Sequence, residues 1–216
     1  MRSFQDAPAA LGWDADGVVV DSKAVAWGAM EDIASLFRDR PQILSAADKT
    51  AAFGPQAQVG MAGEDGAPTL RSMHRILMRH RTHKIRLFDD ALDLVARLVS
   101  RPWLITAAYS GGIREVLGRR AGLFRSIRGC EDGPKDRLIA EAADTGMAWY
   151  VCDTVVDVRR CRESGVSVIA VGWGYDDCAE LIAAGPAMLA RTPRDLEVAL
   201  DDLGFLSSIP ANGGSR

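Results

Sequence analysis

Four short apolar runs recur through the second half of the chain, and each is separated from the next by a segment with helical periodicity. The runs span residues 103–108, 126–130, 148–152 and 166–171. Between the first two, Ile113, Val116 and Leu117 follow the three- and four-residue spacing of a helix. Strands that alternate with helices form βαβ units, whose strands run parallel in one sheet. The sequence therefore predicts an α/β fold with a Rossmann-like, doubly wound parallel sheet.

A further strand is expected near the start of the chain, directly before the segment DADGVVVDS at residues 14–22. The next strand-like run begins only at residue 103, and the interval between them has helix-forming composition with apolar residues three and four apart. We therefore expect a helical cap, residues 22–87, inserted into a catalytic core made of residues 1–21 and 88–216.

The composition argues against some classes of binding partner. A chain of 216 residues with a formal net charge of -3 lacks the basic surface that nucleic-acid binding usually needs. No apolar run approaches the roughly 18 residues that span a bilayer, and the first residues lack the apolar segment of a signal peptide. We expect a cytoplasmic protein that binds a small molecule, with no nucleic-acid or membrane partner. The sequence leaves monomer and homodimer both open.

Two pairs of aspartates follow predicted strands. Asp14 and Asp16 end the first strand, and Asp153 and Asp157 follow the strand at 148–152. If these strands are neighbours, four carboxylates meet in the crevice where open α/β sheets bind ligands. That much negative charge requires a cation, and carboxylate oxygens favour Mg²⁺. Taken alone, the first pair is equally consistent with a solvated turn.

Two further residues lie where they could bind phosphate. Thr106 ends the strand that begins at residue 103, and its hydroxyl could donate to a phosphate oxygen. Lys135 begins the helix before the fourth strand and could neutralise phosphate and carboxylate charge. A lone strand threonine or surface lysine is usually structural. Together with the four aspartates, however, the two residues indicate a phosphate site.

The order of these motifs resembles the four motifs of haloacid dehalogenase superfamily phosphatases. The matching features are DADGVVVDS, a strand ending in Thr106, then Lys135, then the DxxxD pair that starts at Asp153. The segments VGWGYDD at 171–177 and LIAAGPAML at 181–189 are similar to the phosphoglycolate phosphatase branch. The resemblance extends over residues 11–200, with residues 22–87 in the place of the family's helical cap.

This resemblance implies a magnesium-dependent phosphatase that hydrolyses a small phosphomonoester, either a phosphoglycolate-like molecule or a sugar phosphate. Asp14 would attack phosphorus to form an aspartyl-phosphate, while Asp16 would protonate the leaving oxygen and later activate water. The transferring phosphoryl group would be held by Thr106, Ala107 and Lys135. Mg²⁺ would be bound by Asp14, the Asp16 backbone carbonyl and Asp153, with Asp157 supporting from the edge.

The chain departs from the family pattern after Thr106, where Ala107 and Ala108 replace the usual Asn or Ser. Two alternatives stay open. One is a phosphomutase of the β-phosphoglucomutase type, which shares the DxDGV segment and a helical cap, and the other is a non-catalytic binding protein with the same fold. A haloacid dehalogenase is disfavoured, because it needs neither the carboxyl group of Asp16 nor Mg²⁺. The natural substrate is not identified by any pattern in the predicted cap.

Overall fold

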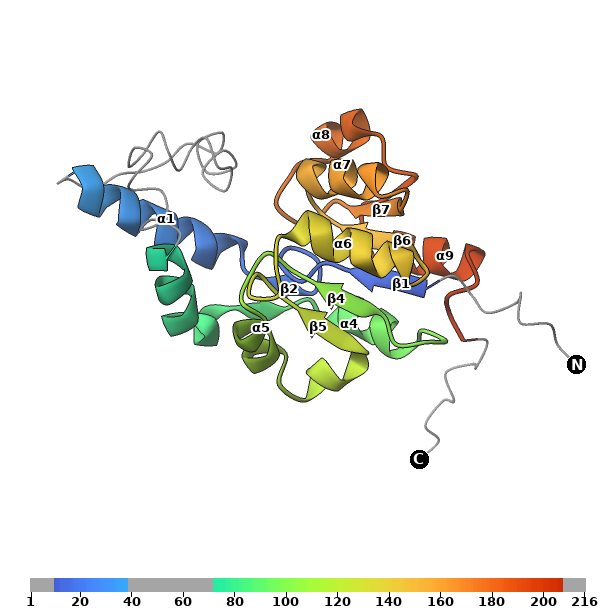
Figure 1. Ribbon diagram of the computed structural model, residues 1–216, viewed down its shortest axis with the longest axis horizontal. Coiled ribbons are helices and arrows are strands. Elements are labelled where there is room, and N and C mark those ends of the chain that lie inside the picture. Colours follow the sequence, from blue (N-terminus) through green and yellow to red (C-terminus); the bar gives the residue numbers. More distant parts are fainter. Residues whose placement is uncertain (1–9, 39–71, 208–216) are drawn as a thin grey trace, which may run out of the picture.

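The centre of the molecule is a six-stranded parallel sheet with strand order β5-β4-β1-β6-β7-β8 (Figure 1). The computed structural model describes residues 10–38 and 72–207. The strands of this sheet are β1 (Ala10–Trp13), β4 (Trp103–Ile105), β5 (Ser126–Arg128), β6 (Met147–Cys152), β7 (Ser167–Val171) and β8 (Met188–Ala190). The predicted α/β class and the doubly wound parallel sheet are confirmed.

Helices cover both faces of the sheet (Figure 1). One face carries α6 (Lys135–Asp144), α7 (Val155–Glu163) and α8 (Cys178–Ala184). The other carries α4 (Asp89–Ala96), α5 (Ser110–Leu117), the 3-10 turn η2 (Gly118–Leu123) and α9 (Pro193–Asp202). In β4, Leu104 packs on the second face while Trp103 and Ile105 pack on the first. Burial on both faces explains why the strands read as continuous apolar runs rather than alternating ones.

Several helices on the carboxyl side of the sheet begin with a capping side chain. The Thr154 hydroxyl accepts a hydrogen bond from the backbone N–H of Asp157 at 3.3 Å, which starts α7. Asp177 forms a capping box with Glu180 at the start of α8. Such caps satisfy backbone donors that have no partner within the helix. They fix where the chain turns from β6 into α7 and from the loop after β7 into α8.

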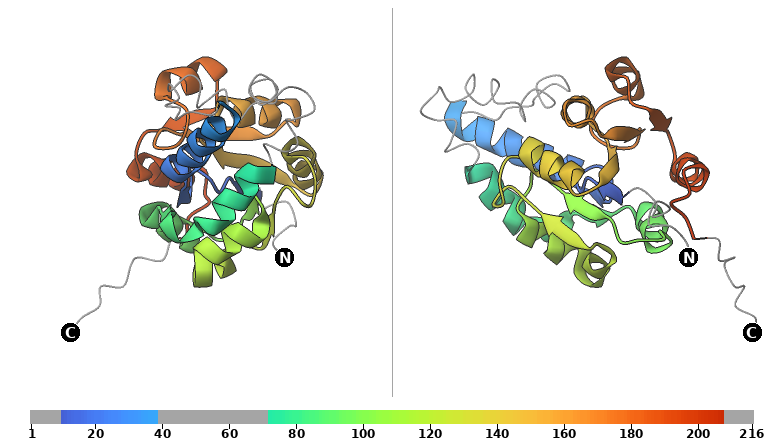
Figure 2. Two further views of the ribbon diagram at one scale, coloured as in Figure 1. Left: turned by 90° about the vertical axis from the view of Figure 1, so that its left-hand side faces the viewer. Right: turned by 45° about the vertical axis from the view of Figure 1, so that its right-hand side comes forward.

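Two short strands form a separate antiparallel ribbon where the chain leaves and re-enters the core, β2 (Val20–Asp21) and β3 (Arg86–Leu87). Beyond them lie α1 (Lys23–Arg38), a helical segment at 72–80 and the 3-10 turn η1 (Thr82–Lys84). Figure 2 shows α1 and the 72–80 helix side by side, and Ile33 of α1 lies in a small apolar cluster with Leu77.

The middle of the predicted cap, residues 39–71, lies outside the described residues. The division into a core and a cap at residues 22–87 therefore stays a prediction. No helix among residues 10–38 and 72–207 is long and apolar enough to cross a membrane.

Candidate active site

Three adjacent strands end side by side at the carboxyl edge of the sheet, and each is followed by a predicted site residue. Asp14 directly follows β1, Thr106 follows β4 and Asp153 follows β6. β1 pairs in parallel with both β4 and β6, so the three carboxyl ends are neighbours. The expectation that the two aspartate pairs follow neighbouring strands is confirmed by this order.

Lys135, the first residue of α6, bridges two of the aspartates inside the protein. Its Nζ atom lies 2.6 Å from Oδ2 of Asp14 and 2.6 Å from Oδ2 of Asp157. The three side chains are only 4%, 6% and 3% exposed, respectively. Arg160 Nη1 lies 2.8 Å from the other carboxylate oxygen of Asp157. Both carboxylate oxygens of Asp157 therefore contact cationic groups, and Asp157 holds the Lys135 ammonium group beside Asp14.

The pKa values of the two carboxyl groups that contact Lys135 are shifted in opposite directions. Burial opposes the ionisation of Asp157, but Lys135 and then Arg160 outweigh it and lower the pKa of Asp157 to about 2. Burial also disfavours the Lys135 ammonium, yet Asp14 and Asp157 outweigh that effect and raise its pKa. For Asp14, burial dominates and raises the pKa, while Lys135 opposes the rise. Lys135 is thus a permanent cation that favours the ionised form of Asp14.

Two hydroxyl groups hold the side chain of Asp16. Ser22 Oγ donates to Oδ1 of Asp16 at 2.6 Å, and Thr106 Oγ1 donates to Oδ2 at 3.1 Å. Thr106 Oγ1 in turn accepts the backbone N–H of Ala108 at 2.9 Å. Ser22 and Thr106 have no exposed surface, whereas Asp16 is partly exposed. The two hydroxyl groups therefore fix the orientation of a partly exposed carboxyl group.

Asp153 has one oxygen whose hydrogen-bonding capacity is not used. Its Oδ2 accepts the backbone N–H of Tyr175 at 2.7 Å, whereas its buried Oδ1 has no hydrogen-bond partner within the described residues. Burial raises the pKa of Asp153 to about 7, against the opposing effect of the Tyr175 N–H. A buried carboxylate oxygen without a donor needs an explanation, and a hard cation such as Mg²⁺ is the partner that fits it.

Two glycines make room for Asp153. A Cβ atom added to Gly17 would lie 1.9 Å from Asp153 Oδ2, and one added to Gly174 would lie 2.1 Å from the same oxygen. Gly17 also has a φ angle of +73°, a conformation that L side chains rarely adopt. The glycine of the DADG motif is therefore required by the close approach of the Asp153 carboxylate to the backbone.

The predicted metal ligands do not form a ready-made side-chain cage. In the part of the chain that the structure describes, no group of three His, Cys, Asp or Glu side chains is arranged to hold a metal ion. Asp157 is committed to Lys135 and Arg160, and the Asp16 side chain to two hydroxyls. The oxygens that remain suit a site completed by a backbone carbonyl, water and a substrate oxygen.

Three residues at the site had no role assigned from the sequence, namely Ser22, Lys23 and Tyr175. Lys23 Nζ donates to the backbone carbonyls of Gly174 and Tyr175 at 2.9 Å each. Ser22 and Tyr175 lie within the DADGVVVDS and VGWGYDD segments, so the motifs contained them. What the sequence lacks is the pairing between them, because 153 positions separate the two residues.

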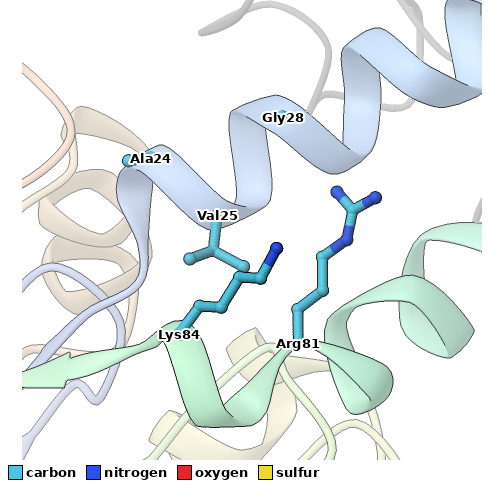
Figure 3. A pocket seen from close by; sticks show the side chains of 5 residues that line it. All are labelled: Ala24, Val25, Gly28, Arg81 and Lys84. Atoms are coloured by element: carbon cyan, nitrogen blue, oxygen red, sulfur yellow. The ribbon is translucent and has the colours of Figure 1, made fainter.

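A separate hollow of about 260 Å³ lies between α1 and η1, lined by Ala24, Val25, Gly28, Arg81 and Lys84 (Figure 3). The Arg81 and Lys84 side chains extend toward α1 in this view. Arg81 forms an ion pair with Asp32 of that helix. The lining residues include no carboxylate, hydroxyl or thiol group, so they offer neither an oxygen ligand for Mg²⁺ nor a carboxylate nucleophile. The catalytic candidates remain those at the carboxyl edge of the sheet.

Among the predicted site residues, the structure brings Asp14, Lys135 and Asp157 into direct contact, and it joins Asp16 to Thr106. Asp153 lies beside them at the end of β6. Ala107 is exposed and directly follows Thr106, so any contact with phosphate would come from its backbone. The catalytic, phosphate-binding and metal roles of these residues stay predictions.

Known proteins resemble this chain in sequence and in fold. The phosphoglycolate phosphatase of Synechococcus elongatus is 31% identical over 130 residues, which cover 55% of this chain and 61% of that protein. The chain thus spans less than two thirds of the length of this curated relative. No protein-family model matches the chain.

Solved structures extend the likeness over most of the chain. A haloacid dehalogenase-like family hydrolase from Streptococcus pneumoniae has a TM-score of 0.76 at 19% identity and covers 89% of this chain and 98% of that one. A predicted phosphatase from Clostridium acetobutylicum has a TM-score of 0.76 at 18% identity, covering 91% and 100% of the two chains. At these identities the structures show the fold, and the predicted haloacid dehalogenase-like fold is confirmed.

Proposed function

We propose that this haloacid dehalogenase-like protein is a magnesium-dependent phosphatase that hydrolyses a small phosphomonoester through an aspartyl-phosphate on Asp14. The contact between Asp14 and Lys135 is the observation that carries the proposal. A buried carboxylate beside a permanent cation, at the carboxyl edge of a parallel sheet, is suited to attack a phosphoryl group. The similarity to phosphoglycolate phosphatase supports the same chemistry.

Asp14 needs to be ionised to act as a nucleophile. Burial raises the pKa of Asp14, and the ammonium group 2.6 Å away opposes that rise and favours the carboxylate. A phosphate group bound in the crevice would be attracted by the same ammonium group, which Asp157 holds in place. Lys135 would therefore have two roles, favouring the carboxylate form of Asp14 and neutralising charge on the phosphoryl oxygens.

Asp16 is positioned to act as the acid and base. It protonates the leaving oxygen when Asp14 is phosphorylated, and it then takes a proton from the water that cleaves the aspartyl-phosphate. Phosphoryl oxygens are bound by the Thr106 hydroxyl, the Ala107 backbone and Lys135. A carboxyl group at position 16 supports a phosphatase over a haloacid dehalogenase, which has no leaving oxygen to protonate.

The residues present fit a magnesium ion. Asp14, the Asp16 backbone carbonyl and Asp153 would hold it, and the unpartnered Oδ1 of Asp153 is the structural observation that supports this set. When bound, Mg²⁺ neutralises charge on the phosphoryl oxygens and orients them. Asp157 acts from the edge of the site, because its two oxygens are bound by Lys135 and Arg160.

The proposed cap, residues 22–87, would lie over this crevice and select the leaving group. A phosphoglycolate-like molecule or a sugar phosphate is the proposed substrate class. The proposal places the enzyme in the cytoplasm, where such metabolites occur, and it holds for a monomer or a homodimer.

The test is phosphate release from phosphoglycolate, a panel of sugar phosphates and p-nitrophenyl phosphate, with Mg²⁺ and with a chelator. We expect release that requires Mg²⁺ and is abolished in Asp14→Asn, which keeps the side-chain shape but removes the nucleophile. Asp90→Asn, an exposed aspartate in α4, is the matched control and should retain activity. Product analysis separates the alternatives, since a phosphomutase would yield a phosphorylated isomer and a binding protein would release nothing.

A further inference from the structure

Tyr175 contacts two segments that are distant from it in sequence. Its backbone N–H donates to Oδ2 of Asp153 at 2.7 Å. Its hydroxyl lies 3.0 Å from Oγ of Ser22, which directly precedes α1. Its ring meets Trp27 of α1 edge-on, with ring centroids 6.4 Å apart and an interplanar angle of 88°. Tyr175 therefore joins the loop after β7 to α1 and to the carboxylates.

The hydrogen-bond directions follow from counting protons. Oδ1 of Asp16 accepts the hydrogen bond from Ser22 at 2.6 Å, which uses the single hydroxyl proton of Ser22. Ser22 Oγ must then accept from the Tyr175 hydroxyl. A tyrosine hydroxyl keeps its proton at neutral pH, so the phenol of Tyr175 can donate it. The chain of donors runs from Tyr175 to Ser22 to Asp16.

In the proposed reaction, substrate binding would change the hydrogen bond between Thr106 and Asp16. Thr106 has a single hydroxyl proton, which it donates to Oδ2 of Asp16 at 3.1 Å. When Thr106 donates to a phosphoryl oxygen instead, Oδ2 of Asp16 loses this donor, and a proton carried on Oδ2 can pass to the leaving oxygen. Asp16 is then ionised and can take a proton from the attacking water in the second step. Oδ1 stays bound to Ser22. During the reaction, the hydrogen bond that orients Asp16 is therefore the one from Ser22.

We infer that Tyr175 is a positioning residue for Asp16 and acts through the Ser22 hydroxyl. This inference rests on the proposed function, because it presupposes that Asp16 transfers a proton to the leaving group. The Tyr175 ring packs on Trp27, and Lys23 binds the backbone carbonyl of Tyr175 at 2.9 Å. Both contacts come from α1, so the orientation of Asp16 is tied to the first turns of the proposed cap.

The test uses the dependence on the leaving group in single turnovers of Tyr175→Phe. An alkyl phosphate such as phosphoglycolate needs a proton on its leaving oxygen, whereas p-nitrophenolate leaves without one. With enzyme in excess, we expect release of the alcohol to slow about tenfold and release of nitrophenol to change less than about twofold. Equal slowing of the two reactions would overturn the inference, because a general structural defect affects both.

Two further variants complete the test. Ser22→Ala should give the same selective loss, and adding Tyr175→Phe to it should cause no further loss, since both remove one chain of donors. An additive double variant would contradict the inference. Tyr150→Phe is the matched control, because its buried hydroxyl donates to the Ile105 carbonyl at 2.6 Å and it should leave the ratio of the two rates unchanged.

Assays of the wild type and of Asp14→Asn show whether the proposed function or only this inference fails. If the wild type is inert, or if Asp14→Asn remains active, the phosphatase proposal fails. If both behave as proposed while Tyr175→Phe slows the two esters equally, only the positioning role of Tyr175 fails.

Discussion

Nζ of Lys135 lies 2.6 Å from Oδ2 of Asp14, with both side chains almost completely buried. A cation beside a carboxylate in this position serves the protein in two ways. It compensates the charge of the carboxylates at the centre of the fold, and it offers a positive group to an incoming phosphate. Experiments can separate these two roles, because charge compensation affects the free energy of unfolding even when no substrate is present.

Replacing Lys135 should destabilise the protein strongly at neutral pH. Lys135→Met leaves Asp14 and Asp157 buried without their shared cation, and we expect the free energy of unfolding to fall by about 3–5 kcal/mol. Urea denaturation at pH 8 measures this change. The control is Arg137→Met on the same helix, whose exposed ion pair with Glu141 contributes about 0–1 kcal/mol. Equal losses in the two variants would refute the buried role of Lys135.

The pH dependence of stability should show the buried carboxyl group of Asp153. In the folded, metal-free protein its pKa is raised to about 7, above the ordinary value of 3.8. Between these values the folded chain keeps a proton that the unfolded chain has released, so this group makes stability fall as pH rises from about 4 to about 7. Thermal unfolding in the presence of a chelator measures the slope.

Asp153→Asn supplies the control for that slope. The variant cannot ionise at this position, so its stability should fall less between pH 4 and pH 7 than that of the wild type. The contribution of Asp157 has the opposite sign and lies below this window, because a pKa of about 2 makes its stabilisation disappear only as pH falls below about 4. A wild-type slope equal to that of Asp153→Asn would contradict the raised pKa of Asp153.

Gly174 should be intolerant of even a methyl group. In Gly174→Ala the new Cβ would lie 2.1 Å from Asp153 Oδ2, so the carboxylate or the loop must move. We expect the stabilisation by Mg²⁺, measured as the rise in Tm on adding the ion, to fall at least by half. Gly122→Ala is the control, because a Cβ there has no atom within 4 Å. Unchanged Mg²⁺ stabilisation in Gly174→Ala would contradict the role of Gly174 in making room for the Asp153 carboxylate.

The sequence predicted the elements whose pattern is local. The strand predicted at 148–152 is found as Met147–Cys152, and Leu138, Ile139 and Ala142 lie on the buried face of α6. These elements are long enough for several apolar residues to define a period. The three residues of Met188–Ala190 define none, so β8 was not predicted. The β2–β3 ribbon was missed for the same reason, since each strand has two residues.

For the candidate site, the sequence predicted the charged residues but not the partners of their side chains. Asp14 and Asp153 directly follow strands, and a parallel sheet brings the ends of its strands together, so the sequence predicted both residues at the site. Lys135 was predicted from its place at the start of a helix and from the order of the motifs. The partners of each carboxylate were not. The pairing of Asp157 with Arg160, and the link from Tyr175 through Ser22 to Asp16, depend on side-chain packing and loop conformation, which leave no periodic signal in the sequence.

The central claim is that Asp14 carries the phosphoryl group, and trapping that intermediate tests it most directly. The protein is mixed with substrate and Mg²⁺, quenched in acid, reduced with borohydride and digested. Borohydride converts an aspartyl-phosphate to homoserine, so we predict homoserine at position 14 in the peptide that contains the DADG segment. Unmodified Asp14 in an enzyme that releases phosphate, or homoserine at another aspartate, would contradict the account.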